Sequence, residues 1–154
     1  MRTLLLLLLL AGCAAAPSRP ARSYPSPSSP EGTLKRGMRN CPNALVGTTT
    51  RVIDTKDGAD VQITATDPVV QQQIIELAIV HAHLGHPNPA EPAHSGMHGG
   101  PGNLGYCPII HTGTKVTVRR RSDGAVIHIH ALHPEDVPHL QLAIADRIAQ
   151  LAVR

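Results

Sequence analysis

Apolar and polar residues alternate along short segments of the chain, and each such segment is followed by a longer stretch with helical spacing. The alternation is clearest in residues 59–66, where the apolar positions are Ala59, Val61, Ile63 and Ala65. A period of two is typical of a strand with one buried face. In residues 68–84 the apolar positions recur at helical spacing, at Val70, Ile74, Leu77 and Leu84. The pattern therefore predicts a β-hairpin followed by a helix.

The turn of this hairpin and the start of its helix carry local signals. Asp57-Gly58 is a strong two-residue turn signal, because a type I′ turn needs positive φ at both central positions. With this pair in the turn, the expected register joins Val52 to Ile63 and Thr50 to Ala65. Asp67 supplies an N-cap and Pro68 the first helical residue.

The complete pattern occurs twice, and the two copies overlay without a gap. The landmarks of the first copy are Cys41-Pro42, Gly47-Thr48, Asp57-Gly58-Ala59 and Asp67-Pro68. They return as Cys107-Pro108, Gly113-Thr114, Asp123-Gly124-Ala125 and His133-Pro134. The second hairpin is expected to pair Val118 with Ile129 and Val116 with Ala131, and to place Arg119 opposite His128. Its helix follows with an apolar stripe. Pro138 is expected either to lie in the first turn or to mark a later helix start than in the first copy.

A single ββα unit of about forty residues is too small to fold alone, so the two copies are expected to share one core. We therefore predict an α+β fold in which the duplicated ββα unit forms a four-stranded antiparallel sheet with two helices on one face. The copies span residues 41–85 and 107–154. A connector rich in His, Gly and Pro, residues 86–106, joins them. The order of the strands across the middle of the sheet stays open.

The first residues follow a different pattern. Met1-Arg2-Thr3 precedes seven leucines, and the run ends in Leu10-Ala11-Gly12-Cys13. This is the pattern of a secretory signal, and the run is too short to span a bilayer. Its ending resembles the lipobox of bacterial lipoproteins. The resemblance implies that residues 1–12 are removed and that Cys13 carries acyl chains. Ala14 after the cysteine implies transport to the outer membrane. An ordinary signal peptide cut near Ala16 is the alternative.

Residues 13–40 are rich in Pro, Ser, Ala and Arg and show no hydrophobic period. Such a segment buries little apolar surface, so it is predicted to be a disordered tether. The net charge of +3 is due to residues before position 41, and residues 41–154 are slightly acidic. The chain has two Tyr and neither Phe nor Trp. These features exclude a nucleic-acid-binding function, which requires basic and stacking residues.

Cys41 and Cys107 occupy the same position of the two copies. Equivalent positions meet when they lie near a pseudo-two-fold axis, and the envelope outside the inner membrane is oxidising enough for disulfides. We therefore predict a Cys41–Cys107 disulfide, worth about 4 kcal/mol by the chain-entropy account. Two reduced thiols or a metal site are the alternatives.

Ten histidines in 154 residues stand out in the composition. Imidazole and thioether groups suit copper, and imidazole also suits zinc. The candidate ligands lie at the end of the first helix and in the connector: His81, His83, His86, His94, Met97 and His98. Their spacing matches no closed structural site, and a solvated low-complexity loop is the alternative. His81 aligns with Arg147 of the second copy, which indicates a boundary position rather than the core.

The polar face of the predicted sheet is expected to be open to water or to a partner. Its candidate interaction residues are Arg51, Lys115, Arg119, His128 and His130. The chain contains no nucleophile elbow, phosphate-binding loop or His-Glu-x-x-His motif, so catalysis is not expected.

The repeated Cys-Pro, Gly-Thr, Asp-Gly and Asp/His-Pro landmarks after a lipobox resemble a group of small bacterial envelope lipoproteins. The resemblance implies export and a two-copy domain, and it implies no mechanism. We expect a non-enzymatic, lipid-anchored protein of the bacterial cell envelope, at the outer membrane facing the periplasm. Its expected role is that of a structural or protein-interaction module, with the membrane and an envelope protein as partners. Copper or zinc binding through the connector is the alternative.

Overall fold

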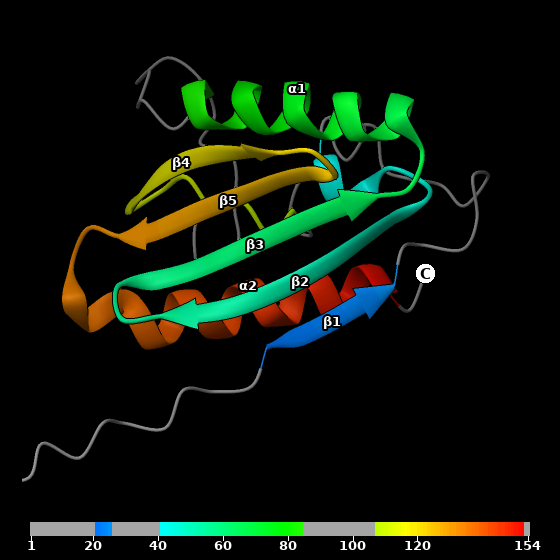
Figure 1. Cartoon of the computed structure of the whole chain (residues 1–154). Coiled ribbons are helices and arrows are strands. Elements are labelled where there is room, and N and C mark those ends of the chain that lie inside the picture. The colour runs from blue at the N-terminus through cyan, green and yellow to red at the C-terminus, as the bar shows by residue number, and fades with distance from the viewer. Residues whose placement is uncertain (1–20, 26–40, 85–106, 153–154) are drawn as a thin grey trace, which may run out of the picture.

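The computed structural model describes residues 21–25, 41–84 and 107–152, and it consists of one antiparallel sheet with two helices (Figure 1). The predicted signal peptide, most of the predicted tether and the connector 86–106 lie outside these residues. None of the helices in the described ranges is long and apolar enough to cross a membrane.

The chain order of the elements is strand–strand–strand–helix, then strand–strand–helix. The strands are β1 (Arg22–Pro25), β2 (Thr48–Thr55), β3 (Gly58–Ala65), β4 (Thr114–Arg121) and β5 (Gly124–Ala131). The helices are α1 (Pro68–Leu84) and α2 (Val137–Ala152), with short 3-10 turns at Pro42–Ala44 and Pro134–Asp136. The sheet order is β1-β2-β3-β5-β4, and every neighbouring pair is antiparallel. The α+β class is confirmed.

The predicted number of strands was wrong, because the sheet has five strands rather than four. The additional strand, β1, comes from the segment that was predicted to be a tether. It pairs along β2, from Arg22 opposite Val52 to Pro25 opposite Thr49. Four residues are too few to show an alternation, and a proline is tolerated in a strand at the sheet edge.

The predicted registers of both hairpins were also wrong. The two-residue loops are Lys56-Asp57 and Ser122-Asp123, so that Val52 pairs with Val61 and Val118 with Ile127. Arg119 consequently lies opposite Val126, not opposite His128. The observed and expected registers differ by two residues, which keeps every side chain on its expected face. The hydrophobic pattern therefore does not distinguish them.

Gly58 and Gly124 are needed where the two central strands approach each other, rather than in the turns. A Cβ atom on Gly58 would lie 2.0 Å from the carbonyl oxygen of Ile129. A Cβ atom on Gly124 would lie 2.1 Å from the carbonyl oxygen of Ile63. Since β3 and β5 are hydrogen-bonded along their length, any side chain at these two positions would force the strands apart.

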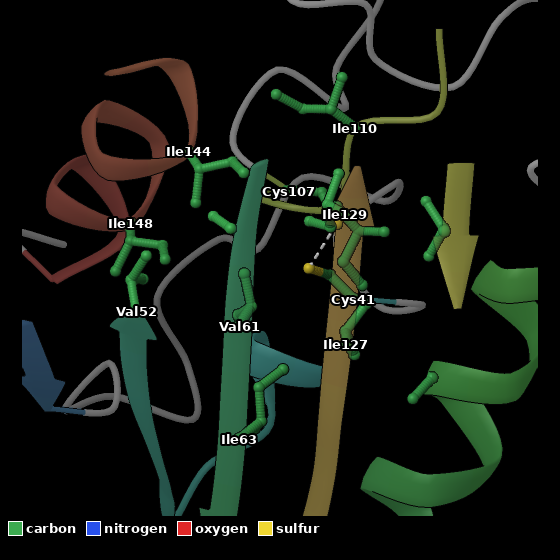
Figure 2. Close-up of a cluster of buried hydrophobic side chains, with 14 of the residues drawn as sticks. Cys41, Val52, Val61, Ile63, Cys107, Ile110, Ile127, Ile129, Ile144 and Ile148 are labelled. Atoms are coloured by element: carbon green, nitrogen blue, oxygen red, sulfur yellow. Dashed lines mark hydrogen bonds between the residues drawn. The ribbon is translucent and has the colours of Figure 1, made fainter. Parts of the chain in front are cut away.

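Both helices pack on the face of the sheet that carries the apolar residues. α1 contacts β3, β4 and β5, whereas α2 contacts β3, β1 and β5. The side chains of Val61, Ile63, Ile127 and Ile129 point into this core, where they meet residues of both helices (Figure 2). The expected N-cap is confirmed, because the Asp67 carboxylate accepts a hydrogen bond from the backbone N–H of Val69 at 2.8 Å.

Substitution of Gly58 by alanine tests the close approach of β3 and β5. We expect Gly58→Ala to lower the free energy of unfolding by about 3 kcal/mol, since the methyl group meets backbone that cannot move aside cheaply. Urea unfolding of the full chain measures the change.

Gly47→Ala is the matched control. Gly47 has φ 85° and no atom within 4 Å of its Cβ position, so alanine there costs only the left-handed backbone strain, about 1 kcal/mol. Equal losses for the two variants would contradict the assigned role of Gly58.

Candidate functional site

The face of the sheet opposite the helices is covered by no other helix or strand of the described residues. All five predicted interaction residues lie on it. One row of paired residues crosses the sheet as Arg51, Gln62, Val126 and Arg119. The next rows place His128 opposite Asp60 and His130 opposite Lys115. We call this surface the open face.

Two histidines of β5 form hydrogen bonds with carboxylates on the open face. His128 Nδ1 lies 2.6 Å from Asp60 Oδ1, and His130 Nδ1 lies 3.0 Å from Asp57 Oδ2. The two imidazole rings are 6.0 Å apart between centroids and 17° from parallel. Each ring therefore uses Nδ1 for its carboxylate, and its Nε2 lies on the other side of the ring.

The carboxylate of Asp57 is held in its ionised form. The hydrogen bond from the Thr55 hydroxyl, at 3.0 Å, and then the contact with His130 lower the pKa of Asp57. A lowered pKa means that Asp57 keeps its negative charge at neutral pH.

Three exposed cations lie on the open face of the slightly acidic domain. Arg51, Lys115 and Arg119 are exposed, and none of them forms an ion pair within the described parts of the chain. Arg121, by contrast, is held by Asp123 through two hydrogen bonds of 2.8 and 3.0 Å. The open face therefore presents three cations to an approaching molecule, beside the two carboxylates that contact the histidines.

The two predicted bridge cysteines meet in the core. Cys41 and Cys107 are 1% and 3% exposed, and their Sγ atoms lie 2.7 Å apart as two thiols beside Ile129 (Figure 2). Burial, followed by the neighbouring Cys107 thiol, raises the pKa of Cys41. A buried neutral thiol is a poor nucleophile and a poor metal ligand. The disulfide itself stays a prediction.

The boundary position expected for His81 was wrong, since His81 is 1% exposed. Its Nδ1 lies 3.0 Å from Nε2 of His111, and the two rings are stacked. The equivalent residue of α2, Arg147, is also buried and donates a hydrogen bond of 3.0 Å to the carbonyl oxygen of Cys107. Burial lowers the pKa of Arg147. The side chains of His81 and Arg147 thus both contact residues 107–111. The spacing of hydrophobic residues along the helices does not reveal such polar contacts.

The described residues contain only part of the predicted metal-ligand set. Only His81 and His83 lie in the described residues; His86, His94, Met97 and His98 lie outside them. His81 is buried against His111, whereas His83 is exposed and its Nδ1 lies 2.7 Å from the carbonyl oxygen of Ile79. Within residues 21–25, 41–84 and 107–152 there is no cluster of three or more potential ligands. Metal binding by the connector therefore stays a prediction.

No protein-family model, no curated protein and no solved structure matches this chain. The features that indicate a function are therefore those of the chain's own residues, above all the residues of the open face.

Proposed function

We propose that this protein is a non-enzymatic, lipid-anchored protein of the bacterial cell envelope whose open face binds an acidic surface of an envelope protein. The observation that carries the proposal is the exposure of Arg51, Lys115 and Arg119 on a face that no described element covers. Guanidinium groups suit carboxylates because their N–H groups match the two oxygens.

The framework beneath these cations is rigid, which favours binding. Arg51 and Arg119 stand on strands at opposite sides of the central pair β3–β5, in one paired row. Hydrogen bonding between strands fixes their spacing before a partner arrives, so that little backbone entropy is lost on binding. Unpaired charges at the rim of such a surface also speed association with a partner of opposite charge.

We also propose that the two ββα halves are duplicated copies of one unit. Val61 and Ile127, which occupy equivalent positions of the two copies, pair directly with each other. The backbone N–H of Ala65 donates to the carbonyl oxygen of Asp123 at 3.0 Å, and that of Ala131 donates to Asp57 at 2.9 Å. These two hydrogen bonds are also equivalent, because exchanging the copies converts one into the other. A two-fold relation between copies accounts for both.

The proposed location depends on the first residues and on the cysteines. The leucine run and Leu10-Ala11-Gly12-Cys13 support cleavage and acylation at Cys13. The contact between the Cys41 and Cys107 sulfurs supports a disulfide, which would persist in an oxidising compartment. Both features favour the envelope, with the protein at the outer membrane and facing the periplasm.

Mass spectrometry of the membrane fraction without reduction tests this location. We expect an acylated peptide that begins at Cys13 and a cross-linked peptide pair that contains Cys41 and Cys107. Cys13→Ser is the control: it should release the chain from the membrane fraction and leave the bridge in place. An unmodified soluble chain would refute the anchor, and two reduced thiols would refute the bridge.

Charge reversal on β4 tests the open face. We expect Arg119→Glu to weaken photo-cross-linking from position Thr117 to an envelope protein by at least about tenfold, because an attraction becomes a repulsion. The measurement uses cells in which residue 117 is a photoreactive amino acid.

Arg120→Glu provides the matched control. Arg120 is the next residue, is also exposed, and pairs with Ala125 on the helix side of the sheet. The same charge change there should leave the cross-link unchanged. Binding through the open face would be contradicted if the two variants lost the cross-link equally. It would also be contradicted if neither variant weakened the cross-link.

A further inference from the structure

We infer that His128 and His130 form a binding site for a divalent transition-metal ion, such as Cu²⁺ or Zn²⁺, on the open face. The inference does not depend on the proposed partner. It also differs from metal binding by the connector, because it uses two residues of β5, an interior strand of the sheet.

The spacing of the two histidines brings their side chains to one face. Residues two apart on a strand point to the same side of the sheet. The rings of His128 and His130 lie side by side, with 6.0 Å between centroids and 17° between planes. Ile129 between them is fully buried in the core, and β5 is hydrogen-bonded to β3 and β4 on either side. The backbone that carries both ligands is therefore fixed.

The carboxylates that contact the two rings favour metal binding by the Nε2 atoms. His128 Nδ1 contacts Asp60, and His130 Nδ1 contacts Asp57. When Nδ1 carries the proton and donates it to a carboxylate, the lone pair of the neutral ring is on Nε2. Metal-ligating histidines in proteins typically have this arrangement, and the carboxylate also makes the ring a stronger ligand. Two carboxylates add negative charge near a divalent cation.

The two Nε2 atoms can converge on one ion from the solvent side. Zinc–nitrogen bonds of about 2.0–2.1 Å require the two nitrogens to approach to about 3.3 Å for tetrahedral geometry. The side chains of His128 and His130 are 25% and 33% exposed. To bind one ion, the rings must tilt toward each other from their present centroid separation of 6.0 Å. Lys115, opposite His130, is exposed and can turn its ammonium group into water.

The site has two protein ligands, so water fills its remaining coordination positions. In the part of the chain that the structure describes, no third His, Cys, Asp or Glu completes a cluster. Such a site is open rather than closed like a structural zinc site. We therefore expect exchangeable binding of one ion per chain.

The first half of the chain supplies a matched replacement for both ligands. Gln62 and Thr64 occupy the positions of the first copy that correspond to His128 and His130, and both are on the open face. The variant His128→Gln/His130→Thr therefore introduces side chains that the same fold already carries at equivalent positions. Loss of metal binding in this variant is separated from loss of folding by circular dichroism.

Titration of the full chain in detergent with CuCl₂ tests the inference. The background carries alanine at His86, His94, Met97 and His98, so that the candidate ligands of the connector do not contribute. We expect one Cu²⁺ per chain by calorimetry and a Cu²⁺ electron paramagnetic resonance spectrum with coupling to two imidazole nitrogens. His128→Gln/His130→Thr should weaken binding at least tenfold. Asp60→Asn keeps both ligands and should weaken it about tenfold, as loss of an outer hydrogen bond does.

His139→Ala is the control, because His139 is an exposed residue of α2 rather than of the open face. It should leave the titration unchanged. Two results would overturn the inference. One is an unchanged Cu²⁺ affinity in folded His128→Gln/His130→Thr. The other is a complete lack of Cu²⁺ binding once the candidate ligands of the connector are removed. Cross-linking from position 117 in the presence of a chelator tests partner binding by the open face without the metal ion. A negative result in the metal titration therefore does not count against the proposed partner binding.

Discussion

The antiparallel pairing of β3 with β5 is the contact on which the rest of the structure depends. It joins the two ββα halves into one sheet, and it requires glycine at positions 58 and 124, where each strand lies against a carbonyl oxygen of the other half. The same pairing aligns the apolar residues of both strands beneath the two helices. It also brings Asp60 against His128. The fold and the candidate site therefore have one structural origin.

The two faces of the sheet have opposite roles because side chains alternate along each strand. One face is buried by α1 and α2 and contains the cysteine pair, where burial raises the pKa of Cys41. The other face carries exposed arginine and lysine and two histidines held by carboxylates. Stability is thus concentrated on one side, and the groups able to bind a partner or a metal ion are concentrated on the other.

The sequence predicted the helices, both hairpins and the face of every candidate residue on the sheet, because the period of the hydrophobic pattern determines these features. It did not predict the registers, since a shift of two residues leaves each side chain on the same face. It missed β1, which is only four residues long. Asp60 and Asp57 were not identified as partners of the histidines, because the order of the central strands was undetermined. His81 was misplaced because its partner, His111, comes from a distant segment.

We propose that the open face is the surface through which this protein binds its partner in the envelope. Chemical footprinting compares its accessibility in intact cells with that of the purified full chain. We expect Lys115, His128 and His130 to react less in cells than in the purified chain. The exposed residues His139 on α2 and Lys56 in the β2–β3 turn should react equally in both. Equal reactivity of all five residues in the two preparations would contradict the proposal.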